Sequence, residues 1–64
     1  MTKFIDLTDK VSGTKVYVNT SAIQLISKNQ NSTIVGFYGS PYSYIEVSES
    51  PETILRRIAE ENNG

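Results

Sequence analysis

The feature that most limits how this chain can fold is the absence of cysteine and histidine from a sequence of only 64 residues. Without them the chain has no disulfide, no thiolate nucleophile and no zinc site of the ordinary cysteine and histidine type. A domain of this size buries only about 60% of the surface of its extended chain, so its core alone gives marginal stability. We therefore expect a single domain over residues 1–64 that gains further stability as a homo-oligomer.

The charge balance excludes several classes of partner. Six lysines and arginines stand against seven acidic residues, which gives a net charge of −1. Binding to DNA or RNA through phosphates needs clustered positive charge, and so does polybasic attachment to a membrane. The first residues, MTKFIDLTDK, contain no apolar signal core, and no stretch approaches the ~20 apolar residues of a membrane span. We expect a cytoplasmic protein with no nucleic-acid or membrane partner.

Alternating apolar and polar residues predict short strands in the first half of the chain. Residues 3–8 (KFIDLT) and 14–19 (TKVYVN) both alternate, and the intervening residues 9–13 (DKVSG) are typical of a turn. Residues 22–27 (AIQLIS) fit a strand through Ile23 and Leu25 and a helical turn through Ile23 and Ile26. Their shortness and polar flanks favour a strand.

A second hairpin is predicted from residues 33–38 (TIVGFY) and 42–48 (YSYIEVS), joined through Gly39-Ser40-Pro41. A three-residue loop gives a register with the facing pairs Ile34 and Glu46, Val35 and Ile45, Gly36 and Tyr44, Phe37 and Ser43, and Tyr38 and Tyr42. Alternation then places one set on the face toward the helix, namely Val35, Phe37, Ile45 and Val47. The opposite face carries Ile34, Tyr38, Tyr42, Tyr44 and Glu46.

The last element is a predicted helix. Ser50 is suited to the N-cap, Pro51 to the first helical position and Glu52 to the positive end of the helix dipole. An apolar stripe at helical spacing follows, formed by Ile54, Leu55, Ile58 and Ala59. The predicted fold class is therefore α+β, a small antiparallel sheet of about five strands built from hairpins, with one C-terminal helix packed on one face.

Four of the six aromatic residues lie between positions 37 and 44. Phe37 is predicted to enter the core, and Tyr44 to cover the gap that Gly36 leaves in the neighbouring strand. A single helix cannot cover both faces of the sheet, so the tyrosines have three interpretations. They form ordinary solvated sheet surface, an oligomer interface, or a surface on which a flat ligand stacks.

The remaining chemistry does not favour catalysis. No glycine-rich phosphate loop is present, and isolated acidic residues such as Asp6 and Glu49 are interpreted as solvated carboxylates. We predict a protein that is not an enzyme and has no cofactor or metal. Arg56 and Arg57 have two interpretations: surface pairs with the helix acids at i,i+4 spacing, or recognition of an anion such as phosphate. The helix acids are Glu52, Glu60 and Glu61.

Three motifs in this order resemble the short FlbD-type flagellar and swarming-motility proteins, and phage or prophage reading frames of similar layout. The motifs are Phe4-Ile5-x-Leu7-Thr8, then Val16-Tyr17-Val18-Asn19-x-x-x-Ile23-x-x-Ile26, then Ile45-x-Val47-x-x-Ser50-Pro51-Glu52-x-Ile54-x-x-x-Ile58. They cover nearly the whole chain and are mostly determinants of the fold. The segment Tyr38-Gly39-Ser40-Pro41-Tyr42 departs from the plain Asn-Gly turn of the FlbD pattern and indicates a specialised surface there.

The resemblance to small phage proteins implies a non-enzymatic, homo-oligomeric binding protein in a bacterial host cell that sequesters a nucleotide-like signalling ligand and so antagonises a host defence pathway. Tyrosines would stack on the base, while Ser40, Asn19 or an arginine would hold polar groups. The alternative is a protein–protein adaptor or regulator similar to the FlbD-type proteins. The candidate ligand-binding or interface residues are Tyr38, Ser40, Tyr42, Tyr44, Asn19, Arg56 and Arg57.

Overall fold

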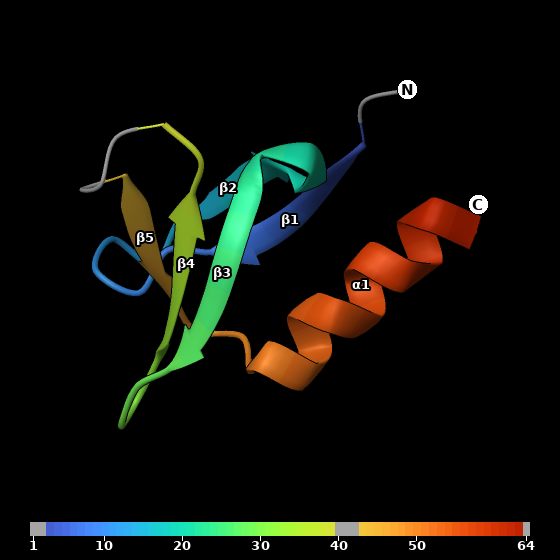
Figure 1. Ribbon diagram of the computed structural model, residues 1–64. Helices are drawn as coiled ribbons and strands as arrows, with labels where there is room; N and C mark the ends of the chain where they lie inside the picture. Colours follow the sequence, from blue (N-terminus) through green and yellow to red (C-terminus); the bar gives the residue numbers. More distant parts are fainter. Residues whose placement is uncertain (1–2, 40–42, 64) are drawn as a thin grey trace.

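The computed structural model describes residues 3–39 and 43–63, with side chains described as far as residue 61. Its strands and helix follow the order β1 (Phe4–Thr8), β2 (Lys15–Asn19), β3 (Ile23–Lys28), β4 (Thr33–Phe37), β5 (Tyr44–Val47) and α1 (Pro51–Asn63) (Figure 1). A short 3-10 helix, η1 (Thr20–Ala22), connects β2 to β3. All the strand pairings are antiparallel, so the predicted α+β class is confirmed.

The strands divide between two sheets, which the hairpin pattern did not reveal. β1 and β2 form one sheet, and β3, β4 and β5 form the other in that order. The two sheets are tied together where the turn after β1 meets β5. There the Lys10 N–H donates to the Glu46 carbonyl at 2.8 Å, and the Ser48 N–H donates to the Thr8 carbonyl at 3.0 Å.

The core lies between the two sheets and the helix. Its buried apolar side chains come from every layer of the structure: Ile5, Leu7, Val18, Val35, Val47 and Ile54. The helix packs chiefly along β1 and β3 (Figure 1), rather than over Val35, Phe37 and Ile45 as the sequence had indicated. This difference follows from the two-sheet arrangement, because Val35 and Val47 share one core with residues of β1 and β2.

The register of the second hairpin agrees with the prediction. Ile34 pairs with Glu46, Val35 with Ile45 and Gly36 with Tyr44, while the Phe37 N–H donates to the Ser43 carbonyl at 2.9 Å. The predicted Tyr38–Tyr42 pair lies outside the described residues. Phe37 packs against the core but stays half-buried, so it lines the margin of the core.

A β-bulge explains why residues 22–27 fitted two periods. The pairing of β3 with β4 shifts between Ile23 and Leu25. A bulge inserts one extra residue and reverses the alternation beyond it. Ile23 and Ile26 therefore both pack against the core, three residues apart within one strand, while Leu25 points outward.

The helix begins as predicted and exposes more of its apolar residues than predicted. The Thr53 N–H donates to the Ser50 hydroxyl at 3.1 Å, which is the N-cap contact. Ile54 is fully buried, and Ile58 packs at the edge of the core. Leu55 is 57% exposed, and Ala59 is also exposed. The buried stripe is thus narrower than the sequence indicated, because the helix lies along strand edges and not across a broad sheet face.

Candidate functional site

Several large apolar side chains of β3–β5 are exposed on the outer face of their sheet. We call this group the tyrosine face, formed by Leu25, Ile34, Tyr38 and Tyr44. Tyr38 is 65% exposed, Tyr44 59% and Leu25 50%, while Ile34 is half-buried. Scattered single apolar residues are normal on a protein surface. These four are instead brought together by one sheet, and the helix packs on another side of the molecule.

The strand register places these side chains next to one another. Tyr44 is the register partner of Gly36, and Leu25 is the partner of Gly36 on the other side. A Cβ built on Gly36 would lie 3.2 Å from the Leu25 side chain, and its three nearest neighbours are all Leu25 atoms. The Leu25 side chain is therefore the nearest neighbour of the space above the glycine, which the sequence had assigned to Tyr44. The Tyr44 ring is left free to face the solvent.

The other predicted site residues do not join Tyr38 and Tyr44. Ser40 and Tyr42 lie outside the described residues. Asn19 caps η1, since its side-chain oxygen accepts the Ser21 N–H at 2.9 Å, and its role in the structure is a local one. Arg56 is exposed on the helix. Of the seven candidate residues, the structure brings Tyr38 and Tyr44 together on one face.

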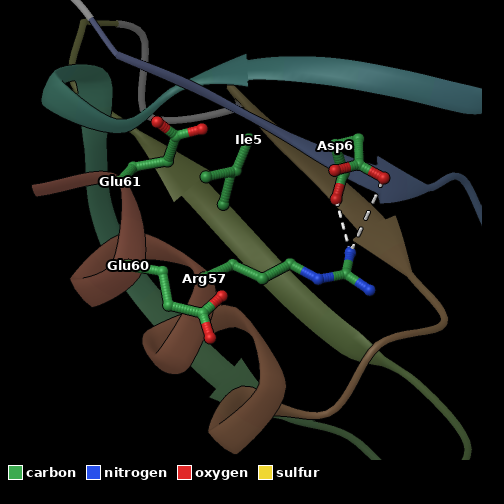
Figure 2. Close-up of a pocket in the computed structure, with 5 residues that line it drawn as sticks. All are labelled: Ile5, Asp6, Arg57, Glu60 and Glu61. Atoms are coloured by element: carbon green, nitrogen blue, oxygen red, sulfur yellow. Dashed lines mark hydrogen bonds and ion pairs between the residues drawn. The ribbon is translucent and has the colours of Figure 1, made fainter. Parts of the chain in front are cut away.

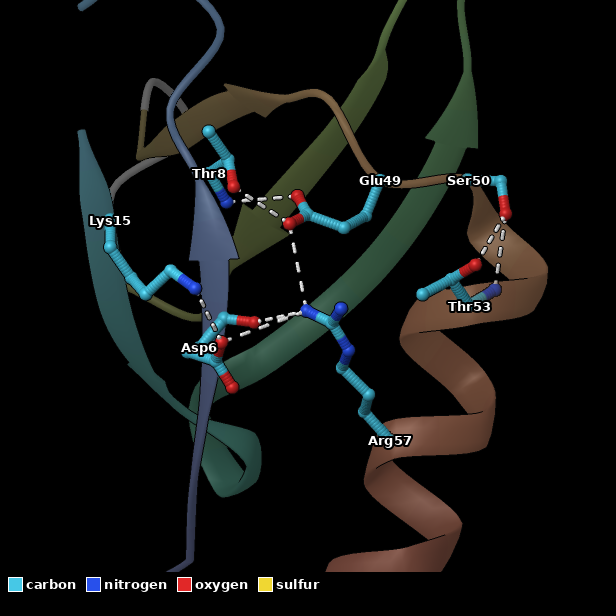
Figure 3. Close-up of polar contacts among 7 residues, drawn as sticks. All are labelled: Asp6, Thr8, Lys15, Glu49, Ser50, Thr53 and Arg57. Atoms are coloured by element: carbon cyan, nitrogen blue, oxygen red, sulfur yellow. Dashed lines mark hydrogen bonds and ion pairs between the residues drawn. The ribbon is translucent and has the colours of Figure 1, made fainter. Parts of the chain in front are cut away.

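Arg57 belongs to a polar cluster that joins the helix to β1, which we call the polar junction (Figure 3). Its guanidinium donates to the Asp6 backbone carbonyl at 2.6 Å and lies 3.5 Å from the Glu49 carboxylate. Glu49 in turn accepts the N–H of Thr8 at 2.8 Å and its hydroxyl at 2.9 Å. The predicted pairing of Arg57 with helix acids is wrong, because its partners come from β1 and the β5–α1 connection. The interpretation of Glu49 as a solvated carboxylate is also wrong, because its side chain is only 13% exposed and is bonded to Thr8. The Asp6 carboxylate stays 42% exposed, as the prediction of a solvated carboxylate requires.

Both carboxylates of the polar junction are held in the charged form. Burial alone would raise the pKa of Glu49, but the two hydrogen bonds from Thr8 and the nearby Arg57 charge outweigh it, and the net pKa is lowered. The Lys15 ammonium, 3.1 Å from Asp6, is the main cause of the lowered pKa of Asp6. Charged groups that satisfy one another in this way fix the helix against β1.

A pocket of about 310 Å³ opens beside the polar junction, between β1 and α1 (Figure 2). Three carboxylates and a single guanidinium line it together with one apolar side chain; the residues are Ile5, Asp6, Arg57, Glu60 and Glu61. The guanidinium points at Asp6 and is already engaged there. An anionic ligand such as a phosphate would meet excess negative charge in this pocket.

The described part of the chain offers no centre for metal chemistry, since no three acidic side chains there converge on a common point. No helix within it combines the length and the apolar character that crossing a bilayer requires. The comparisons with known proteins give no further guidance: no protein-family model, curated protein or solved structure matches this chain.

Reasoning from the sequence missed Leu25 in the tyrosine face and all of the polar junction. The strand interpretation grouped Leu25 with Ile23 at period two, whereas the bulge turns Leu25 outward. The competing spacing of Ile23 and Ile26 was the trace that this bulge left in the sequence. The junction joins residues 41 and 51 positions apart, at Thr8–Glu49 and Asp6–Arg57. Spacing rules for helix pairs cannot detect contacts over such separations.

Proposed function

We propose that this chain is a small non-enzymatic binding protein that captures a protein partner on the tyrosine face. The observation that carries this proposal is the exposure of Tyr38, Tyr44 and Leu25 on one sheet face that no other described element covers. Tyrosine is among the residues enriched in the centres of protein interfaces, because its ring buries a large area while its hydroxyl keeps a hydrogen-bond partner.

The surroundings of the face favour a protein over a free anion. Glu46 lies on the same face, where its carboxylate accepts a hydrogen bond from the Ser32 hydroxyl. The pocket that contains Arg57 lies elsewhere, between β1 and α1. An exposed apolar face with a carboxylate at its border suits a partner that brings apolar side chains and a positively charged rim.

Capture of a nucleotide-like signalling ligand, in a phage setting, is the second candidate. It is supported by the two exposed tyrosine rings, because aromatic side chains stack on bases at about 1–3 kcal/mol per base. A simple absorbance measurement distinguishes this candidate function from the first. A bound nucleotide carried through purification gives absorbance at 260 nm, which denaturation releases into the small-molecule fraction.

A photocrosslinking experiment tests the proposal. A benzophenone amino acid at position 44 should crosslink one protein from the host lysate. The same group at Phe4, an exposed aromatic on β1 and thus a matched control, should not. The crosslinked protein is then purified, and its dissociation constant is measured against the parent, Tyr38→Ser, Tyr44→Ser and Phe4→Ser.

Each tyrosine variant should weaken binding roughly tenfold or more, as expected for residues near the centre of an interface, and Phe4→Ser should bind like the parent. Equal affinity of all four proteins would contradict the proposal. Release of a nucleotide from the parent, but not from Tyr38→Ser or Tyr44→Ser, would favour the second candidate instead.

A further inference from the structure

The β1–β2 sheet has an edge whose backbone groups face away from β1. The Asp9 N–H donates to the Thr14 carbonyl at 2.8 Å, and the Thr20 N–H donates to the Lys3 carbonyl at 2.9 Å. Hydrogen-bonded pairs alternate along an antiparallel ladder. Residues 14, 16, 18 and 20 therefore point their backbone groups at β1. Lys15 and Tyr17 point both of their backbone groups to the opposite side, and Asn19 points its N–H there. The Asn19 carbonyl accepts the first hydrogen bond of η1, because Asn19 is the N-cap of that helix.

This edge differs from the outer edges of β5 and β3. The outer edge of β5 is bonded to Thr8 and Lys10 of the first hairpin, and β3 lies along the helix. No second strand within residues 3–39 and 43–63 pairs with the outer edge of β2. Unpaired edges of this kind are templates for the addition of another strand.

We propose that a second copy of this chain pairs with the edge of β2, antiparallel and about a two-fold axis at Tyr17. In this register Tyr17 faces the partner's Tyr17, and Lys15 faces the partner's Asn19. Four backbone hydrogen bonds result. Two join the tyrosines, and in two more the Asn19 N–H donates to the Lys15 carbonyl across the axis. The result is one continuous sheet of four strands, with a β1 strand at each end.

The side chains suit this pairing. Lys15 forms an ion pair with Asp6 of its own chain and meets an uncharged asparagine across the axis, so no like charges face each other. Tyr17 is 71% exposed and gains an aromatic neighbour. On the inner face Val16, which is half-buried, would lie opposite Val18 of the partner subunit and extend the apolar core. A core of this size has most to gain from such an extension.

Charge reversal across the two-fold axis provides the test. Sedimentation equilibrium is run on the parent, Tyr17→Lys, Tyr17→Glu, an equimolar mixture of these two variants, and Val11→Lys. The last is a matched control, because Val11 is 85% exposed in the turn after β1 and adds the same charge away from the edge. Tyr38 and Tyr44 are intact throughout, so the result does not depend on the function of the tyrosine face.

The parent and Val11→Lys should dimerise equally. Each Tyr17 variant alone should dimerise roughly tenfold more weakly, because like charges would face each other, and the mixture should regain dimer. Circular dichroism checks that each variant is folded. Dimer formation in the mixture is a second check, because two unfolded variants could not pair with each other. A monomeric parent, or a parent-like dimer of Tyr17→Lys, would overturn the proposal. So would a mixture no more dimeric than its components.

Discussion

The polar junction and the tyrosine face use the same small molecule in opposite ways. At the junction, Arg57, Glu49 and Thr8 satisfy one another's hydrogen bonds and hold the helix to β1. On the tyrosine face, Tyr38 and Tyr44 leave more than half of their surface to the solvent. The polar residues of the junction thus stabilise the fold, whereas the two tyrosines contribute little to its stability.

This contrast separates two kinds of conspicuous residue. An arginine on a helix is often assigned to anion binding, whereas here its partners within the chain account for it. Tyrosines in a sheet are often assigned to packing, whereas here the core is complete without their rings. Whether a residue has partners inside the fold is therefore a better guide to function than its chemical type.

The largest effect should come from the core that both regions border. Ile54→Ala should lower the free energy of unfolding by about 2–5 kcal/mol, because it leaves a cavity among fully buried side chains. Leu55→Ala, at the next position of the same helix, should change it by less than about 1 kcal/mol. Urea denaturation measures both. Similar losses for the two variants would show that the helix does not pack through Ile54.

A smaller loss is expected at the polar junction. Arg57→Met keeps the apolar stem of the side chain and removes the guanidinium from the Asp6 carbonyl and Glu49. The free energy of unfolding should fall by about 1–3 kcal/mol, the cost of leaving such partners without their charged hydrogen bond. Arg56→Met, on the exposed side of the helix, is the matched control and should be nearly neutral. A parent-like Arg57→Met would remove the structural role assigned to the junction.

The acid dependence of stability should sharpen the contrast further. The pKa of Glu49 is lower in the folded protein than in the unfolded chain. The Glu49 charge therefore stabilises the fold at a pH above the ordinary glutamate pKa, and this stabilisation is lost as the pH falls through the lowered pKa. Glu49→Gln should be less stable than the parent at pH 7, and the difference should shrink below about pH 4.5. Urea titrations at both pH values test this. A constant difference would mean that the Glu49 charge is not coupled to folding.

The sequence predicted the elements better than their arrangement. Alternation found the strands, and the Ser50-Pro51 pair found the start of the helix, because these signals are local. The register of β4 with β5 also followed from local counting across the loop. The division of the strands into two sheets did not follow from local counting, because it depends on how hairpins from distant parts of the chain pack together.

For the candidate site, prediction succeeded where strand alternation continued and failed where it was broken. Tyr38 and Tyr44 were placed on the face away from the helix, as observed. Leu25 was misplaced because the bulge in β3 reversed its direction. The partners of Arg57 were missed because a contact between distant parts of the chain leaves no spacing in the sequence to detect.

The stability of the double variant Tyr38→Ser, Tyr44→Ser tests the central claim most directly. If the tyrosine face serves binding and not folding, the free energy of unfolding of this variant should lie within about 1 kcal/mol of the parent value, since both rings are mostly exposed. Urea denaturation at pH 7 gives this value. A loss of about 3 kcal/mol or more, equal to that of a buried core residue, would contradict the account and make the tyrosines part of the fold.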